Sequence, residues 1–194
     1  MKTAFDPVKH QYFIDDRPVP SVTQVLREVL PGSVWTATPW HMDRGTAVHA
    51  CAALIAQGKA FEHDQEIDGQ VEACRSFFRE DKPEVIDVEV AGYSTTYQFA
   101  GKRDMFCVLK GKRTIVDWKS AFAWVDMIQA GGYGLLCPDA THGMIVELGE
   151  DGQCRRSEHF KLAQPKNEFL ACRSVYGIRQ RLGLIKSKED ADGN

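Results

Sequence analysis

The segment Gly101-Lys-Arg-Asp-Met-Phe-Cys-Val-Leu-Lys-Gly-Lys-Arg-Thr-Ile-Val-Asp-Trp-Lys119 decides the fold prediction for this chain. Extended stretches at Tyr97–Leu109 and Thr114–Lys119 flank the basic turn Lys110–Arg113, which is typical of an antiparallel β-hairpin. The segment also contains two aspartates and a lysine at alternating strand positions. Side chains two residues apart on a strand share a face, so Asp117 and Lys119 are predicted to point the same way.

The hairpin register depends on the length of its loop. A two-residue loop at Lys110-Gly111 sets Asp104 directly opposite Asp117, whereas a four-residue loop sets Asp104 opposite Lys119. Both registers keep Asp104 and Asp117 on one face, and a three-residue loop would separate them. Two of the three alternatives therefore bring the carboxylates together.

Two facing carboxylates repel one another, by up to roughly 1 kcal/mol on a hairpin. A divalent cation with oxygen ligands would neutralise them, and aspartate suits Mg²⁺ or Mn²⁺ better than zinc. The alternative interpretation is that Asp104, Asp117 and Lys119 are solvated charges on the outer face of the hairpin. The neighbouring basic residues are open to the same two interpretations, a phosphate-binding edge or a solvated turn: Lys102, Arg103, Lys110, Lys112 and Arg113.

The remaining pattern predicts helices before the hairpin and a helix, a strand and a helix after it. This order indicates an α/β (α+β) domain with a central mixed β-sheet flanked by helices. We expect a single domain over residues 1–185 and a polar, disordered tail over residues 186–194. The predicted elements are helices at 21–30, 43–57, 67–78, 124–136 and 167–182 and strands at 85–90 and 144–148, with a short hairpin or strand at 12–17.

Composition excludes several classes of protein. The formal net charge of −3 gives no overall basic signature of a nucleic-acid partner, although local basic patches remain compatible with it. No stretch reaches the roughly 20 apolar residues that span a bilayer, and no signal peptide precedes the domain, so we expect no membrane association and a cytoplasmic location. The cysteines form no CxxC pair, which counts against a zinc site.

The hairpin and its surroundings resemble the PD-(D/E)xK nuclease superfamily, and specifically the RecB-like exonuclease branch with its small phage-type members. Five elements of the family pattern occur in order across roughly ninety residues. They are Gly45-Thr-Ala-Val-His49 on a helix, Glu89 on a strand, Gly101-Lys-Arg-Asp104, Asp117-Trp-Lys119, and Gln129-Ala-Gly-Gly-Tyr133 on a helix. The cysteine spacings of the cluster-carrying members are missing, so we expect no iron–sulfur cluster.

The resemblance implies a restriction-endonuclease-like core and a Mg²⁺- or Mn²⁺-dependent deoxyribonuclease. Such an enzyme would be an exonuclease hydrolysing DNA ends in phage recombination or repair, in a bacterial or phage-infected cell, with DNA (an end or a single strand) and a recombination protein as partners. The resemblance assigns metal binding to His49, Asp104, Asp117 and Glu89. It assigns catalytic roles to Lys119, Asp117, Asp104, Gln129 and Tyr133, of which the last two would orient Lys119 or contact the DNA backbone. Oligomeric state does not follow from it.

The function, the place of Glu89 and the reason for three glycines stay open at this stage. The chain could be a DNA- or partner-binding protein that keeps the nuclease fold without activity, or a metal-dependent RNase. Glu89 follows only from the resemblance, because Asp87 shares its face and a hairpin through 92–96 would set Glu89 opposite about Gln98, far from Asp104. The glycines at 131, 132 and 134 indicate either close approach by DNA or the sheet, or a broken helix.

Overall fold

The computed structural model describes residues 2–30, 32 and 39–185 of the chain, and within 39–42 the backbone alone. The predicted tail at 186–194 lies outside the described residues. No helix in the described ranges is long and apolar enough to cross a bilayer.

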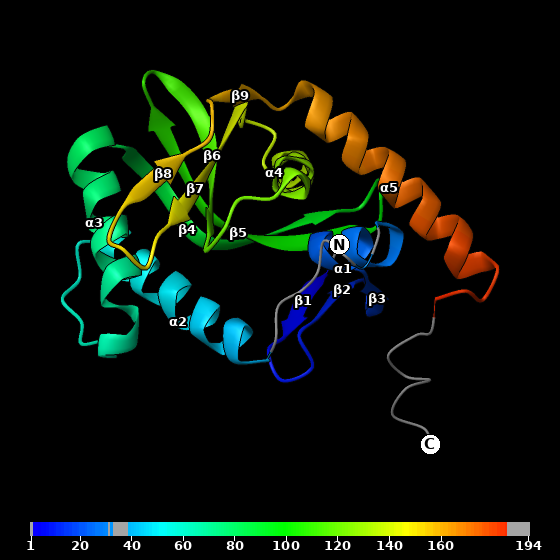
Figure 1. The fold of residues 1–194 in the computed structure, drawn as a ribbon. Coiled ribbons are helices and arrows are strands. Elements are labelled where there is room, and N and C mark those ends of the chain that lie inside the picture. Colours follow the sequence, from blue (N-terminus) through cyan, green and yellow to red (C-terminus); the bar gives the residue numbers. More distant parts are fainter. Residues whose placement is uncertain (1, 31, 33–38, 186–194) are drawn as a thin grey trace.

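A six-stranded mixed sheet forms the centre of the molecule (Figure 1). Its order is β4 (Glu84–Ser94), β5 (Phe99–Leu109), β6 (Lys112–Lys119), β7 (His142–Leu148) and β8 (Cys154–Arg156), with β9 (Phe160–Lys161) also pairing with β7. Neighbouring strands are antiparallel except β6 and β7, which are parallel. Helix α4 (Trp124–Leu136) connects these two strands. The predicted α+β fold with a central mixed sheet flanked by helices is therefore confirmed, and β8 and β9 are strands that the sequence pattern did not indicate.

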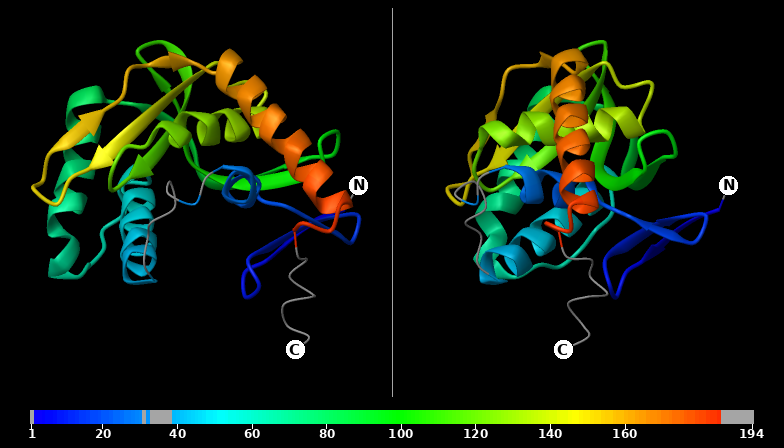
Figure 2. Two further views of the ribbon diagram at one scale, coloured as in Figure 1. Left: turned by 45° about the vertical axis from the view of Figure 1, so that its right-hand side comes forward. Right: turned by 90° about the vertical axis from the view of Figure 1, so that its right-hand side faces the viewer.

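Two hydrophobic clusters cover the two faces of this sheet. One contains Phe106 and Ile115 with the buried sides of α1 (Val22–Val29), α4 and α5 (Ala163–Arg181). The other contains Met105 and Val116 with α2 (Pro39–Ala56) and α3 (Asp68–Asp81). In the left view of Figure 2, α2 and α3 stand on one side of the sheet and α5 on the other. The alternation of Met105 with Phe106 and of Ile115 with Val116 places successive side chains on opposite faces, as a strand requires.

The N-terminal segment forms a small sheet of its own, followed by α1. Strands β1 (Thr3–Asp6), β2 (Gln11–Ile14) and β3 (Arg17–Val19) pair antiparallel in that order. The Ser21 hydroxyl accepts a hydrogen bond from the Gln24 N–H at 3.0 Å, so the predicted N-cap of α1 is confirmed. A short 3₁₀ turn, η2 (Gln65–Ile67), leads into α3.

The glycines of α4 allow close packing of helices and do not break the helix. An added Cβ at Gly131 would lie 2.3 Å from the carbonyl carbon of Pro165 in α5, and one at Gly132 would lie 2.9 Å from the ring of Phe169. The sequence raised close approach by DNA or by the sheet, or a broken helix, and none of these is needed to explain Gly131 and Gly132. The partner that approaches closely is α5.

Acid should destabilise the protein through His159. Its Nε2 lies 2.8 Å from the hydroxyl of buried Thr114, and its ring centroid lies 5.0 Å from that of His142. Burial, His142 and the nearby Lys112 and Lys110 lower the pKa of His159 from 6.5 to about 4. Between pH 6.5 and pH 4, His159 is therefore protonated in the unfolded chain but neutral in the folded chain. The free energy of unfolding falls as the pH drops through this range.

The variant His159→Gln keeps a hydrogen-bond donor for Thr114 and removes the titrating ring. Between pH 7 and pH 4.5 we expect wild type to lose more free energy of unfolding than this variant does. Solvent screening of the partly exposed ring holds the difference to about 1 kcal/mol or less. Urea unfolding at both pH values measures it, and equal losses in the two proteins would contradict the expectation.

Candidate metal and catalytic site

The turn between β5 and β6 fixes the register of the central hairpin. Lys110 and Gly111 form a two-residue loop with positive φ angles of 50° and 74°, the combination that a tight hairpin turn requires. Leu109 pairs with Lys112 and Met105 with Val116. The same register extended by one pair sets Asp104 opposite Asp117, so the two-residue alternative is confirmed.

Asp104 links the hairpin to α2. Its Oδ1 lies 3.1 Å from Nδ1 of His49, and its Oδ2 accepts a hydrogen bond from the Trp118 N–H at 2.9 Å. Burial opposes the charge on this carboxylate. The His49 ring, Lys119 and the Trp118 N–H outweigh burial and hold the pKa of Asp104 at about 2. Asp104 is therefore an ionised acceptor at neutral pH, suited to a cation.

Asp117 and Lys119 lie together on the face that α4 covers. The Lys119 Nζ is 2.6 Å from Asp117 Oδ2, and the Asp117 side chain is 1% exposed. Apart from this ion pair, Asp117 Oδ2 has no hydrogen-bond partner within the described part of the chain. Burial, with Asp104 nearby, raises the pKa of Asp117 to about 7. The Lys119 ammonium is thus the charge that compensates this buried carboxylate, and a bound cation would be a further one.

Lys119 is held in its charged form by the acidic groups around it. Burial alone would lower its pKa, but Asp117 and Asp104 raise the pKa above its ordinary value. Asp126 contributes from the first turn of α4, with Oδ1 3.9 Å from the Lys119 Nζ. An ammonium fixed in this way can stabilise negative charge that develops on a bound phosphate.

Glu89 joins the site because the β4–β5 hairpin is longer than the sequence predicted. The strands continue to Ser94 and from Phe99, so Gly92 pairs with Gly101 and the turn lies at 95–98. The predicted register, with Glu89 opposite about Gln98, is wrong. Glu89 lies between the pairs Val88–Met105 and Val90–Arg103, and this position is opposite Asp104.

A three-residue cluster suited to a metal ion results. His49, Glu89 and Asp104 each offer one ligand atom, and these atoms lie within 4.8 Å of one another. Glu89 has a φ of +56°, an uncommon backbone conformation for a residue with a side chain. Asp117 is not part of this cluster but stands across the hairpin from Asp104. The structure thus brings together the four residues that the resemblance assigned to metal binding, three of them tightly.

Gln129 and Tyr133 bond to each other and not to Lys119. The Gln129 Nε2 donates to the Tyr133 hydroxyl at 2.9 Å and lies 3.5 Å from the Thr23 hydroxyl of α1. Burial and the Asp117 and Asp104 charges raise the pKa of Tyr133, so its hydroxyl stays protonated. No hydrogen bond from this pair to Lys119 is found in the described ranges. Of the two roles that the resemblance implies, orienting Lys119 has no direct hydrogen bond to support it, and contact with the DNA backbone stays a prediction.

Sequence reasoning missed Asp126. Its Oδ2 accepts the Ala123 N–H at 2.6 Å, which caps α4, while Oδ1 faces Lys119. An acidic residue in the first turn of the predicted helix was the available signal. Four members of the basic cluster around the hairpin are ion-paired, and a phosphate-binding edge stays a prediction. The pairs are Lys102–Glu89, Arg103–Asp87, Lys110–Asp81 and Arg113–Asp139.

Comparison with known proteins gives distant structural likenesses. No family model and no curated protein matches the sequence. A phage-related exonuclease from Haemophilus somnus 129PT is similar at a TM-score of 0.43 and 12% identity, over 86% of this chain and 96% of that one. An alkaline exonuclease from Laribacter hongkongensis gives a TM-score of 0.36 at 12% identity over 82% and 92%. Its complex with dAMP gives 0.36 at 14% identity over 87% and 95%. Likeness at this level does not assign an activity, which has to be argued from the site.

Proposed function

We propose that this chain is a divalent-metal-dependent deoxyribonuclease, an exonuclease of the RecB-like branch that hydrolyses phosphodiester bonds at DNA ends in phage recombination or repair. The observation that carries the proposal is the convergence of His49, Glu89 and Asp104 within 4.8 Å, beside the ion pair of Lys119 with the buried Asp117. Oxygen and imidazole donors beside a fixed ammonium suit phosphodiester hydrolysis with Mg²⁺ or Mn²⁺.

The roles of the residues follow from their chemistry. His49, Glu89 and Asp104 would hold the ion, with the Asp117 carboxylate across the hairpin as a further donor. The bound ion would lower the pKa of a water molecule and polarise the phosphate. Lys119 is placed to stabilise charge on the phosphate oxygens, and the protonated Tyr133 hydroxyl is a second hydrogen-bond donor near the same carboxylates. Asp126 acts through Lys119 and is a positioning residue.

Digestion of end-labelled nucleic acids tests this function. Wild type is incubated with linear single-stranded and double-stranded DNA, circular DNA and RNA of matched sequence, in Mg²⁺, Mn²⁺ or EDTA. We expect linear DNA to be degraded in either metal and not in EDTA, while the circle resists. Degradation of RNA alone would indicate a metal-dependent RNase. Tight DNA binding without cleavage in both metals would indicate a binding protein without activity.

The variant Asp104→Asn separates the metal site from the rest of the fold. The amide keeps an acceptor for the Trp118 N–H but loses the charge that faces His49. We expect Mn²⁺ affinity, measured by calorimetry, and the cleavage rate to fall together by at least about 100-fold, because loss of a ligand outweighs the 10- to 100-fold cost of losing its supporting partner. Asp139→Asn, at an exposed ion pair near the other end of β6, is the matched control and should match wild type. Unchanged metal binding in Asp104→Asn would contradict the assignment.

A further inference from the structure

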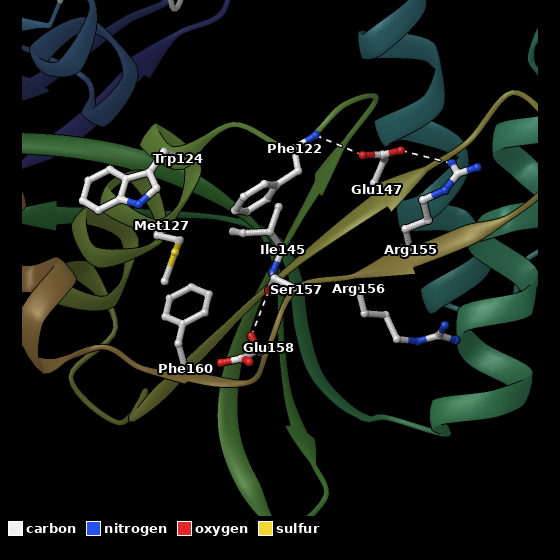
Figure 3. Close-up of a pocket in the computed structure, with 10 residues that line it drawn as sticks. All are labelled: Phe122, Trp124, Met127, Ile145, Glu147, Arg155, Arg156, Ser157, Glu158 and Phe160. Carbon is white, nitrogen blue, oxygen red and sulfur yellow. Dashed lines mark hydrogen bonds and ion pairs between the residues drawn. The ribbon is translucent and has the colours of Figure 1, made fainter.

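A hollow beside the candidate site has no role in the chemistry proposed above. It encloses about 480 Å³ and is lined by aromatic and aliphatic side chains with a polar rim (Figure 3). This volume lies in the range of small-molecule binding pockets. The lining residues are Phe122, Trp124, Met127, Ile145, Glu147, Arg155, Arg156, Ser157, Glu158 and Phe160.

The hollow begins one strand away from the catalytic residues. Ile145 and Glu147 on β7 are the parallel partners of Asp117 and Lys119 on β6. Partner side chains on adjacent parallel strands point to the same face of a sheet, and the strands lie roughly 4.8 Å apart. Phe122 follows Lys119 by three residues, and Trp124 is the first residue of α4. A nucleotide whose phosphate lies at Lys119 therefore has this hollow within reach.

The lining suits a flat, uncharged group. Trp124 is 64% exposed and Phe122 47% exposed, although both are large apolar side chains. Figure 3 shows the rings of Trp124, Phe122 and Phe160 around the hollow, with Met127 and Ile145 between them. Base stacking on aromatic side chains stabilises single strands by roughly 1–3 kcal/mol per base. Packing within the protein leaves these rings largely exposed, and stacking on a base would cover them.

The charges of the rim disfavour a phosphate in this hollow. Arg155 pairs with Glu147 at 3.1 Å and with Asp151 at 2.5 Å. Arg156 is turned towards α3, where it pairs with Asp81 and Glu80. Both guanidinium groups are thereby neutralised, and Glu158 adds negative charge. The occupant that fits is the base of a nucleotide and not its phosphate.

We propose that this hollow binds one unstacked nucleobase of the strand being cut, next to the scissile phosphate, with Trp124 as the principal stacking surface. The proposal rests on the proposed nuclease function and names the form of its substrate. A base held there has left the duplex stack, so the strand entering the site is single-stranded or frayed at its end.

Binding of oligonucleotides to Trp124→Ala tests the proposal without relying on cleavage. Fluorescence anisotropy with labelled single-stranded DNA is measured in EDTA for wild type, Trp124→Ala, Trp124→Phe and the control Tyr97→Ala, which removes an exposed aromatic at the tip of the β4–β5 hairpin. We expect Trp124→Ala to weaken binding about 5- to 140-fold, from the stacking energy and a tenfold change per 1.4 kcal/mol. Trp124→Phe should recover most of the affinity, and Tyr97→Ala should equal wild type.

A scan with single abasic sites then locates the base. Oligonucleotides that each lack one base are bound by wild type and by Trp124→Ala. We expect one abasic position to weaken wild type by about the same factor as the substitution, and to leave Trp124→Ala unaffected, because both changes remove the same stacking contact. Equal binding by wild type and Trp124→Ala, or an equal loss at every abasic position, would overturn the proposal. If the scan gives this result but wild type cuts no DNA in Mg²⁺ or Mn²⁺, the base site stands and the nuclease function falls.

Discussion

Replacing Lys119 by methionine should reduce DNA cleavage by at least about 100-fold, since loss of one preorganised donor to a developing oxyanion typically costs 10²–10³ in rate. Methionine keeps the length of the apolar stem and removes only the ammonium that lies 2.6 Å from Asp117. The variant keeps His49, Glu89 and Asp104, the three clustered candidate ligands, so it should still bind Mn²⁺. Single-turnover digestion of end-labelled linear DNA in saturating Mg²⁺ measures the rate.

Stability must be followed in the same variant. Breaking a buried ion pair costs roughly 3–5 kcal/mol when the remaining charge stays unpaired. Asp117, whose pKa is already raised to about 7, avoids part of that cost by taking up a proton. A thermal melt and the retained Mn²⁺ binding together establish that the variant is folded at the assay temperature.

Lys112→Met is the matched control for Lys119→Met. It makes the same chemical change at the exposed start of the same strand. It should cut DNA at the wild-type rate. A folded Lys119→Met protein with a rate within threefold of wild type would show that the ammonium has no part in the chemistry.

Gly131→Ala is expected to lower stability through packing alone, without loss of a charged group. In an exposed helix this change would stabilise by up to roughly 1 kcal/mol, because alanine is the better helix former. At Gly131 the new methyl group would lie 2.3 Å from the carbonyl carbon and oxygen of Pro165, both backbone atoms of α5. Overpacking of this kind costs typically 1–3 kcal/mol, and more where backbone has to move. We expect a net loss of at least about 2 kcal/mol, or roughly 4–8 °C in melting temperature for a chain of this size.

Gly177→Ala provides the opposite result on the neighbouring helix. The nearest atom to an added Cβ there is Arg173 Nη1 at 3.3 Å, the far end of a flexible side chain. This variant should melt at the same temperature as wild type or slightly higher. Scanning calorimetry of both variants checks the pair, and a Gly131→Ala protein as stable as wild type would mean that α4 and α5 can separate without cost.

Local pattern was sufficient where a single turn controls the geometry. Lys110-Gly111 forms a tight loop, so the positions of Asp104, Asp117 and Lys119 relative to each other follow from counting along two strands. The capping serine of α1 and the strand and helix order were accessible for the same reason. Each depends on interactions between residues close in sequence.

Glu89 could not be placed in this way, because Gly92 suggested a turn that does not exist. An added Cβ at Gly92 would lie 2.6 Å from Leu136 Cβ, so this glycine lets the end of α4 pack on the strand. The true turn at 95–98 contains no glycine and is closed by Gln98 in a left-handed conformation, with φ of +53°. A glycine in a sequence can mark either a turn or a place where a distant helix packs closely on the backbone. The sequence alone does not distinguish the two.

By itself, the sequence determined the hairpin, its register once the short loop is chosen, and the shared face of two carboxylates and a lysine. Only the tertiary structure decided that α2 brings His49 to Asp104, that Glu89 lies opposite Asp104, and that Asp126 of α4 faces Lys119. The physical reason is the distance along the chain over which each interaction acts. Strand alternation and turn geometry act over a few residues, whereas the remaining candidate residues lie on elements whose position is set by packing of the two hydrophobic clusters against opposite faces of the sheet.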